Sequence, residues 1–187
     1  GNFAAAGEGT CRSLVFGGVA MRFPKLRFAF QEGGVAWAAV LLAGLLGHYE
    51  KRNVEAIQHY DPARLDRERL AALFEKHARG RMRETMDRLG DALSGLSDPN
   101  EDLARVDMFG ESGIRSADDL LRMFREQFFF GCEADDPMNA IAFSSSLTPG
   151  GIQLPAVFAS DVGHWDVRDM REVLPEAYEL VEEGRID

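Results

Sequence analysis

Acidic and imidazole side chains come directly after an apolar run near the end of the chain, in VFASDVGHWD, residues 157–166. Asp161 and Asp166 offer carboxylate oxygens, and His164 between them offers imidazole nitrogens. Carboxylates and imidazole bind divalent metals, and both also transfer protons in enzymes. We therefore predict that Asp161 and His164 are catalytic residues and that Asp161 is also a metal ligand.

Carboxylates follow two other apolar runs of the chain. Glu32 comes after LRFAF, residues 26–30, and Glu133 comes directly after QFFFGC, residues 127–132. If the three runs are parallel strands, their carboxyl ends meet at one edge of the sheet, where sites form in α/β folds. The sequence therefore predicts Glu32 as a second metal ligand and Glu133 as a substrate-binding residue.

A carboxylate that follows a strand can instead cap the next helix, because helix N-termini favour acceptors and negative charge. We favour this capping role for Asp135, Asp136 and Asp166. For Asp161 we favour function, because a run of strand character precedes it and Gly163-His164 follows it.

Two ring side chains are further candidates for substrate binding. His164 could bind a substrate carboxylate or phenolate, or orient Asp161, and a loop histidine that packs on Trp165 is an equally weighted alternative. Trp37 begins the helix that follows Glu32, so it is a candidate lining residue, although packing is the more common fate of tryptophan. The predicted substrate-binding set is thus Trp37, Glu133 and His164.

Strands and helices must alternate to position these residues. β-Favouring apolar runs predict strands at 26–30, 127–132 and 156–160. Helical spacing predicts helices at 10–22, 35–52, 116–126, 138–147 and 168–184, and one or two amphipathic helices within 62–95. Such alternation predicts a parallel sheet whose apolar strands are covered on both faces.

Helix-capping residues, prolines and glycines refine these boundaries. Ser116 is the predicted N-cap of its helix, with Asp119 in the capping-box position. Pro175 could divide the last helix and Gly184 could end it, while residues 97–102 predict a turn. Cys132, at a strand end, is expected to be a buried, unreactive thiol.

Composition and charge exclude several classes of function. The 187 residues carry a net charge of −10 and no basic stripe, so we expect no nucleic-acid partner. The most apolar run, residues 33–47, is shorter than the roughly 20 residues of a membrane span, so it predicts a buried helix and no membrane association. With no secretion signal and two distant cysteines, a cytoplasmic location is expected.

Two motifs resemble amidohydrolase family 2, whose members are metal-dependent hydrolases and decarboxylases on a (β/α)8 barrel. The motifs are LVFGGVAMRFPKLRFAFQEGGVAW, residues 14–37, and VFASDVGHWDVRDM, residues 157–170. The resemblance covers residues 10–50 and 115–187. It implies an α/β fold in which residues 1–187 form one incomplete domain, the C-terminal part of a TIM-type barrel (about strands 6–8), with a helical insertion at 55–112.

The resemblance also implies a metal site, in which Asp161 matches the last-strand aspartate. Glu32 stands where the family often has a histidine, and the family's H-x-H pair and a further histidine are absent from this chain. The chain alone would therefore hold only part of that site. A divalent metal, most often zinc, is the implied cofactor.

The implied activity is metal-dependent hydrolysis of a small organic acid, ester, lactone or amide. Two alternatives remain open: non-oxidative decarboxylation by the same family, and a truncated or degenerate barrel that acts as a non-catalytic binding module. An incomplete barrel leaves a sheet edge to be covered. We therefore expect a homo-oligomer, or completion by further segments of the same gene product.

Overall fold

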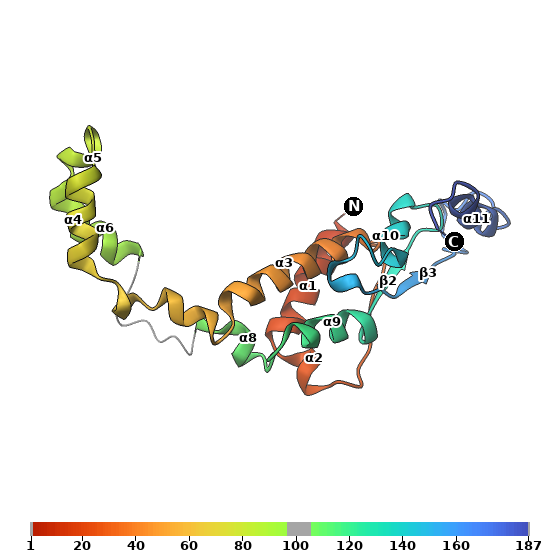
Figure 1. Ribbon diagram of the computed structural model, residues 1–187. Helices are drawn as coiled ribbons and strands as arrows, with labels where there is room; N and C mark the ends of the chain where they lie inside the picture. The colour runs from red at the N-terminus through yellow and green to blue at the C-terminus, as the bar shows by residue number, and fades with distance from the viewer. Residues whose placement is uncertain (1, 97–105, 187) are drawn as a thin grey trace.

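Three strands form a parallel sheet in the computed structural model, which describes residues 2–96 and 106–186 (Figure 1). The strands are β1 (Phe28–Phe30), β2 (Phe128–Cys132) and β3 (Ala156–Phe158), and their order in the sheet is β1-β2-β3. Phe30 lies beside Phe130, and Phe130 lies beside Ala156. The predicted parallel pairing is confirmed, although β1 and β3 are shorter than the runs that predicted them.

The prediction of a barrel segment is wrong. Helices make up 59% of the structure, and the three-stranded sheet does not close. Within the described residues only β2 pairs on both sides, so β1 and β3 are the two edges of the sheet. Closure needs strands that tilt and pair all the way round. Strands of three to five residues in an open order of three cannot provide it.

Helices surround and extend this sheet. In the described residues they are α1 (Phe3–Phe16), α2 (Val19–Arg22), α3 (Ala36–Arg52), α4 (Arg67–His77), α5 (Arg81–Glu84), α6 (Leu89–Leu96), α8 (Met108–Glu111), α9 (Ala117–Glu126), α10 (Ala140–Phe143) and α11 (Val173–Glu182). Short 3-10 turns are η1 (Ala56–Tyr60), η2 (Pro62–Arg64), η3 (Met86–Arg88), η4 (Pro137–Asn139) and η5 (Pro149–Gly151).

Glycine and proline explain where the helices differ from prediction. The single helix expected at 10–22 is two, because Gly18 takes the left-handed conformation at φ +67° between α1 and α2. Pro175 does not divide α11, since it lies in the first turn, where proline is tolerated. Gly184 has φ +67° just beyond the helix, as its predicted role requires. The turn predicted at 97–102 lies outside the described residues.

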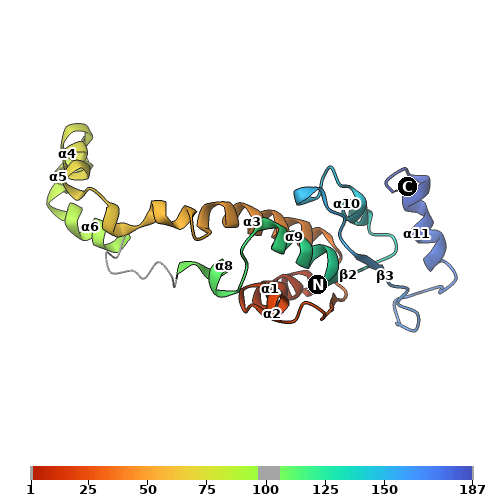
Figure 2. The same ribbon diagram turned by 60° about the horizontal axis from the view of Figure 1, so that its bottom comes forward.

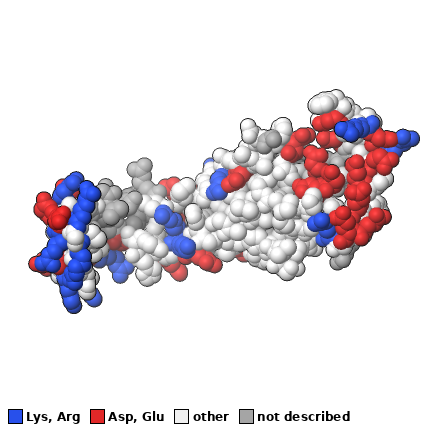
Figure 3. Space-filling view, turned by 90° about the horizontal axis from the view of Figure 1, so that it is seen from above, with Lys and Arg blue, Asp and Glu red and all other residues white. Residues whose placement is uncertain are grey.

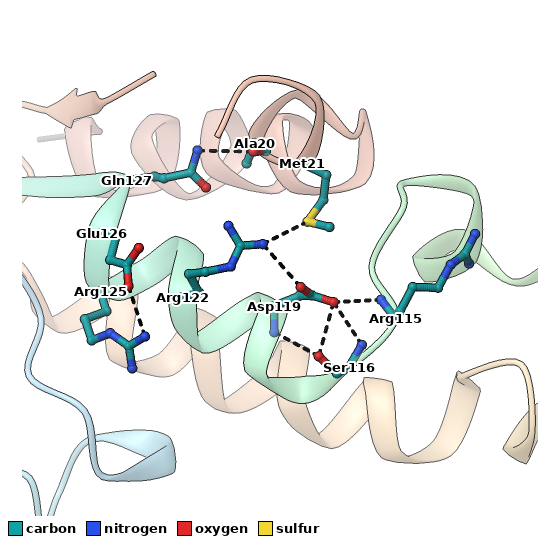
Figure 4. Close-up of polar contacts among 9 residues, drawn as sticks. All are labelled: Ala20, Met21, Arg115, Ser116, Asp119, Arg122, Arg125, Glu126 and Gln127. Atoms are coloured by element: carbon teal, nitrogen blue, oxygen red, sulfur yellow. Dashed lines mark hydrogen bonds and ion pairs between the residues drawn. The ribbon is translucent and has the colours of Figure 1, made fainter. Parts of the chain in front are cut away.

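The predicted capping box at the start of α9 is confirmed (Figure 4). The Ser116 hydroxyl accepts from the Asp119 backbone N–H, and the Asp119 carboxylate accepts from the Ser116 backbone N–H. Arg122, one turn later, donates to the same carboxylate at 3.2 Å. These bonds fix the start of the helix that leads directly into the central strand β2.

An aromatic cluster forms the core beneath the sheet. The rings of Phe30 and Phe130, on neighbouring strands, stack with centroids 5.8 Å apart. Trp37 from α3 meets both of them edge-on at 5.3 Å. Phe124 from α9 meets Phe128 edge-on at 5.2 Å. Because these rings come from α3, α9, β1 and β2, their packing ties both helices to the sheet.

The expectation that every strand is covered on both faces holds for β2 and is wrong for the two edge strands, since Ala29 of β1 is exposed and so is much of β3. Most of β2 is buried, whereas Val157 and Phe158 of β3 are exposed. The reason is position, because β2 lies between two strands and β3 lies at an edge of the sheet. The run that predicted β3 is apolar without being deeply buried.

Helices α4, α5 and α6 form an arm far from the sheet, at the end of the stretch that continues α3 (Figures 1 and 2). Neither α4 nor α5 buries a residue. The amphipathic stripe predicted for 62–95 therefore gains little burial, and Leu73 and Met82 are exposed. The assignment of 55–112 as an insertion within a domain stays a prediction.

The apolar run at 33–47 forms much of α3, as predicted, but only one face of it is buried, and Val40 is exposed. It supplies the start of α3, where Leu41, Leu42 and Leu45 lie in the core. No helix in the described part of the chain has the length and apolar character needed to span a membrane.

Candidate functional site

Glu32, Asp161 and His164 come together beyond the carboxyl ends of β1 and β3. One ligand atom from each of the three side chains lies within 4.8 Å of the others. His164 Nδ1 lies 3.5 Å from Asp161 Oδ2 and 3.9 Å from Asp166 Oδ1. The structure thus brings together the two predicted metal ligands and the predicted catalytic histidine.

The sheet and a turn create this proximity. Glu32 lies two residues beyond β1 and Asp161 three residues beyond β3, with β2 between the two strands. The His164 backbone N–H donates to the Asp161 carbonyl at 2.9 Å, so a tight turn folds the imidazole back over the carboxylate. Gly163, with φ +103°, lets the chain make that turn.

An acidic groove of about 380 Å³ surrounds the three residues. Figure 3 shows the densest gathering of acidic side chains at the end of the molecule away from the arm. The carboxylates that line the groove are Glu32, Glu133, Asp135, Asp161, Asp166, Asp169, Glu172 and Glu176, with Arg168 and His164 among them. So many like charges favour a cation in the groove.

A smaller cavity of about 30 Å³ lies at the sheet edge between the strands. Its walls include Gln31, Glu32, Glu133 and Asp161. This volume is enough to hold a water molecule. Carboxylate groups from all three strand ends therefore reach a space suited to one ion or one water.

Glu133 has a raised pKa. Partial desolvation is the main cause, although the residue as a whole is exposed, and the negative charges of Asp161, Asp135 and Glu32 raise it further. A carboxyl group in such surroundings holds its proton more readily than an ordinary glutamate. This property suits a residue that exchanges protons with a bound molecule.

The donor set fits a divalent metal. Two carboxylates and one imidazole are ligands that zinc accepts, and fewer than four protein ligands leave coordination positions open. Around a tetrahedral ion with bonds of about 2.1 Å, ligand atoms lie about 3.4 Å apart. The 3.5 Å between His164 Nδ1 and Asp161 Oδ2 already matches that spacing. Glu32 is exposed, so a rotamer change can close the remaining gap.

Trp37, the other predicted substrate-binding residue, does not line this groove. Its ring packs on Phe30 and Phe130 in the core, and its buried Nε1 has no partner among the described residues. Packing, the alternative weighed for it, is therefore its observed role.

Of the three acids predicted as helix caps, one caps a helix and the other two line the groove. Asp136 caps η4, because its side chain accepts from the Met138 backbone N–H at 2.9 Å. Asp135 and Asp166 line the groove instead, and Asp166 cannot cap α11, which begins at Val173. Asp166 therefore belongs to the candidate site, although the sequence predicted a capping role for it.

Besides Asp135 and Asp166, three further acids of the groove were not predicted as site residues: Asp169, Glu172 and Glu176. They come from the loop and first turn that follow Asp161. The sequence holds a signal for them, because acidic residues are frequent in DVRDMREVLPEA and all three lie within fifteen residues of Asp161.

The predicted buried thiol is confirmed. Cys132 is buried at the end of β2, and burial raises its pKa to about 11. Burial also raises the pKa of Cys11 in α1. Neither thiol is ionised near neutral pH, so neither is suited to nucleophilic chemistry.

Comparison with known proteins adds no relative to this picture: no family model, curated protein or solved structure matches the chain. The resemblance of two motifs to amidohydrolase family 2 stays a prediction.

Proposed function

We propose that this chain is a metal-dependent hydrolase. Glu32, Asp161 and His164 would hold a divalent metal, with zinc the best match to the ligands. The substrate would be a small organic acid, ester, lactone or amide. The observation that carries the proposal is the convergence of these three side chains from the ends of two strands that do not pair with each other.

The surrounding groove supports this assignment. A volume of about 380 Å³ lies within the range of small-molecule sites. The carboxylates around it would repel an acidic substrate, so a bound cation is needed to offset their charge. When bound, a divalent metal polarises a carbonyl group and makes water more acidic.

Two carboxyl groups are placed for proton transfer. Asp161, beside His164, would accept the proton of the attacking water. Glu133, whose pKa is raised mainly by burial and then by Asp161, donates a proton to the leaving group.

Metal titration tests the site directly. Chain freed of metal by a chelator should bind about one zinc ion in calorimetry. Asp161→Asn and His164→Gln should each weaken binding at least about tenfold, because each removes one ligand. Glu179→Gln removes a carboxylate of α11 that does not line the groove, and should bind zinc as the unmodified chain does.

Turnover tests the reaction. With zinc present, a panel of small esters, lactones and amides should include a substrate whose hydrolysis falls at least about a hundredfold in Asp161→Asn. Release of carbon dioxide from organic acids in the same panel would identify decarboxylation instead. Hydrolysis that survives in Asp161→Asn would overturn the proposed role of this residue.

A non-catalytic cation-binding module is the second candidate. The openness of the site favours it, since the side chains of Asp161 and His164 are 32% and 57% exposed. Hydrolytic sites work best where water is excluded around the reacting groups. Stoichiometric zinc binding without turnover on any member of the panel would select this candidate.

A further inference from the structure

The arm formed by α4, α5 and α6 carries an open groove of about 580 Å³. Much of its wall is apolar, with contributions from Phe74, Met82, Met86, Leu89 and Ala92. Met82 is 56% exposed, and neither α4 nor α5 buries a residue. The arm therefore presents clustered apolar side chains to water, a feature that marks contact with another molecule.

Basic side chains accompany this arm groove. Arg81 and Arg88 line it, against one acid, Asp91. Neither arginine forms an ion pair with another described residue. Residues 76–83 add four basic side chains, one histidine and no acid, and in Figure 3 the densest gathering of Lys and Arg lies on the arm. The groove therefore suits an apolar surface that carries negative charge beside it.

α11 presents an apolar stripe of that kind, made of Leu174, Tyr178 and Val181. The three side chains are 63%, 64% and 42% exposed. Their spacing of four and three residues places them on one face of the helix. α11 buries Val173 and Leu180 instead, so its attachment to the rest of the chain does not use the stripe.

Negative charge lies beside the stripe. α11 carries three glutamates and no basic residue. Glu182 follows Tyr178 by four positions, so the two side chains are neighbours on the helix surface. No described residue forms an ion pair with Glu182. The acidic groove adjoins the same helix, since Glu176 of α11 lines it. The end of the molecule that carries α11 is therefore opposite in charge to the arm.

We propose that the arm groove binds the exposed stripe of α11 from a second copy of this chain, as a groove receives an amphipathic helix. Tyr178 is the central anchor of the stripe, and Arg81 and Arg88 are the cations of the groove that attract Glu182. The arm and α11 lie at opposite ends of the molecule (Figures 1 and 2), so one chain cannot fill its own groove.

This contact is head-to-tail. A pair joined by it keeps one groove and one helix free, so the assembly grows until a ring closes or a filament forms. One helix face in one groove is at the small end of specific interfaces, and we expect a dissociation constant on the order of tens of micromolar. The contact does not depend on the proposed metal site.

Sedimentation velocity measures the association. The unmodified chain should form species larger than a monomer as its concentration rises. The association should weaken at least about threefold between about 0.05 M and about 0.5 M salt, because the charges that attract the two ends are exposed to solvent. A chain that stays monomeric at about 0.5 mM, well above the affinity expected of a small interface, would overturn the proposal.

Single variants locate the contact. Tyr178→Ala removes the anchor from the stripe, and Met82→Glu places an acid in the groove; each should weaken self-association at least about tenfold. Tyr60→Ala and Val40→Glu are the matched controls, because these positions are 65% and 73% exposed and do not line the groove. Both controls should associate as the unmodified chain does. An equal loss in the controls would show general adhesion of apolar surface, against the proposal.

A mixture of the two variants tests the pairing itself. Tyr178→Ala keeps an intact groove and Met82→Glu keeps an intact stripe, so unlike chains can form one intact contact. The mixture should form a heterodimer with the affinity of the unmodified contact, and no larger species. If the mixture stayed monomeric, the groove and the stripe would not bind each other and the proposal would fail.

An anionic lipid surface is the competing partner, because a basic arm with exposed apolar side chains also suits a membrane. Vesicles that contain phosphatidylserine test it by co-sedimentation, and the chain should remain in the supernatant. Binding to the vesicles that Met82→Glu abolishes, with no self-association in their absence, would assign the arm to lipid and overturn the proposal.

Discussion

Glu32 and Asp161, the two carboxylates that converge from opposite edges of the sheet, share a left-handed backbone, with φ +62° and +47°. No other non-glycine residue in the described part of the chain has positive φ. Side chains with a Cβ atom disfavour this region, glutamate more than aspartate. Backbone strain of this kind concentrates where function fixes a side chain in place.

Glu32→Gly should therefore raise the stability of the protein while weakening metal binding. Glycine accepts positive φ without a Cβ clash, and the change also removes one charge from an acidic groove. We expect a gain of about 0.5–1 kcal/mol in the free energy of unfolding, or about 1–4 °C in Tm. Thermal unfolding without metal measures it.

Glu179→Gly is the matched control, because Glu179 lies within α11 with helical backbone. That substitution should cost about 1 kcal/mol, as glycine does inside helices. If Glu32→Gly lost as much stability as Glu179→Gly, the left-handed backbone at Glu32 would carry no strain.

Glu133→Gln should stabilise the protein at neutral pH in the absence of metal. The pKa of Glu133 is raised above its ordinary 4.5 by burial and by neighbouring carboxylates, so its ionised form is less favourable in the folded protein than in the unfolded chain. The penalty is present at neutral pH and disappears as pH falls through the raised pKa, when the group takes up a proton.

Urea unfolding between pH 4 and pH 7 checks this sign. The gain in Glu133→Gln should be at most about 0.5 kcal/mol at pH 7, because water screens an exposed charge. It should shrink toward zero near pH 4. A gain that grew as the pH fell would contradict the direction of the shift. Glu179→Gln, outside the groove, controls for the loss of one negative charge.

The capping box predicts the opposite dependence on pH. Partial burial raises the pKa of Asp119, but hydrogen bonds from Arg115, Arg122 and Ser116 outweigh it and lower the pKa below 3.8. The ionised carboxylate therefore stabilises the fold above about pH 4, and this stability is lost as pH falls through the lowered pKa.

Asp119→Asn should cost about 1–2 kcal/mol at pH 7, because bonds to a charged acceptor become bonds to a neutral one. The difference from the unmodified chain should narrow by pH 3. Ser116→Ala removes the other half of the box and should cost about 1 kcal/mol at pH 7 and keep most of that cost at pH 3, because the bond from the Asp119 N–H to its hydroxyl does not depend on the charge of the carboxylate. Chemical unfolding at pH 7 and pH 3 separates the two patterns.

The elements that local rules govern were predictable from the sequence. The capping box at Ser116 and Asp119 depends only on residues three apart. The apolar run of α3 and the three β-favouring runs likewise carry their own period and composition. These features survive in the structure because nothing distant overrides them.

The features that depend on distant contacts were not predictable. A short motif such as residues 157–170 carries no information on how many strands pair with the strand that it contains. The barrel predicted from the resemblance was therefore wrong. The exposure of Phe158 follows from the edge position of β3, which sequence does not record. The positive φ of Glu32 is equally invisible, since a glutamate gives no local sign of it.

The site was predicted in part, for a physical reason. Acids at the ends of parallel strands must share an edge, so the meeting of Glu32 and Asp161 followed once the sheet was parallel. Trp37 packs in the core because the neighbouring phenylalanines receive its ring, and its role in substrate binding stays a prediction. Asp166 failed as a cap because its helix begins seven residues later, at Val173.

Gln127 connects the core to the position of β1, and it supplies the last prediction. Its buried side chain donates from Nε2 to the carbonyls of Ala20 and Phe23 at 3.1 and 3.3 Å, and the Ala20 bond is drawn in Figure 4. Its backbone carbonyl accepts from the Phe28 N–H at 2.8 Å. One residue thus holds both the loop before β1 and the first residue of that strand.

Gln127→Leu keeps the size of the side chain but leaves these carbonyls without their buried donor, which should cost about 1–3 kcal/mol. Gln153→Leu, at an exposed glutamine with a single bond to the Phe143 carbonyl, should change stability by less than about 0.5 kcal/mol. Because β1 carries Glu32 at its end, Gln127→Leu should also weaken zinc binding although it touches no proposed ligand. Amide hydrogen exchange should speed up at Phe28 and Phe30 before it does in α11. Unchanged exchange in β1 would show that Gln127 does not help to position Glu32.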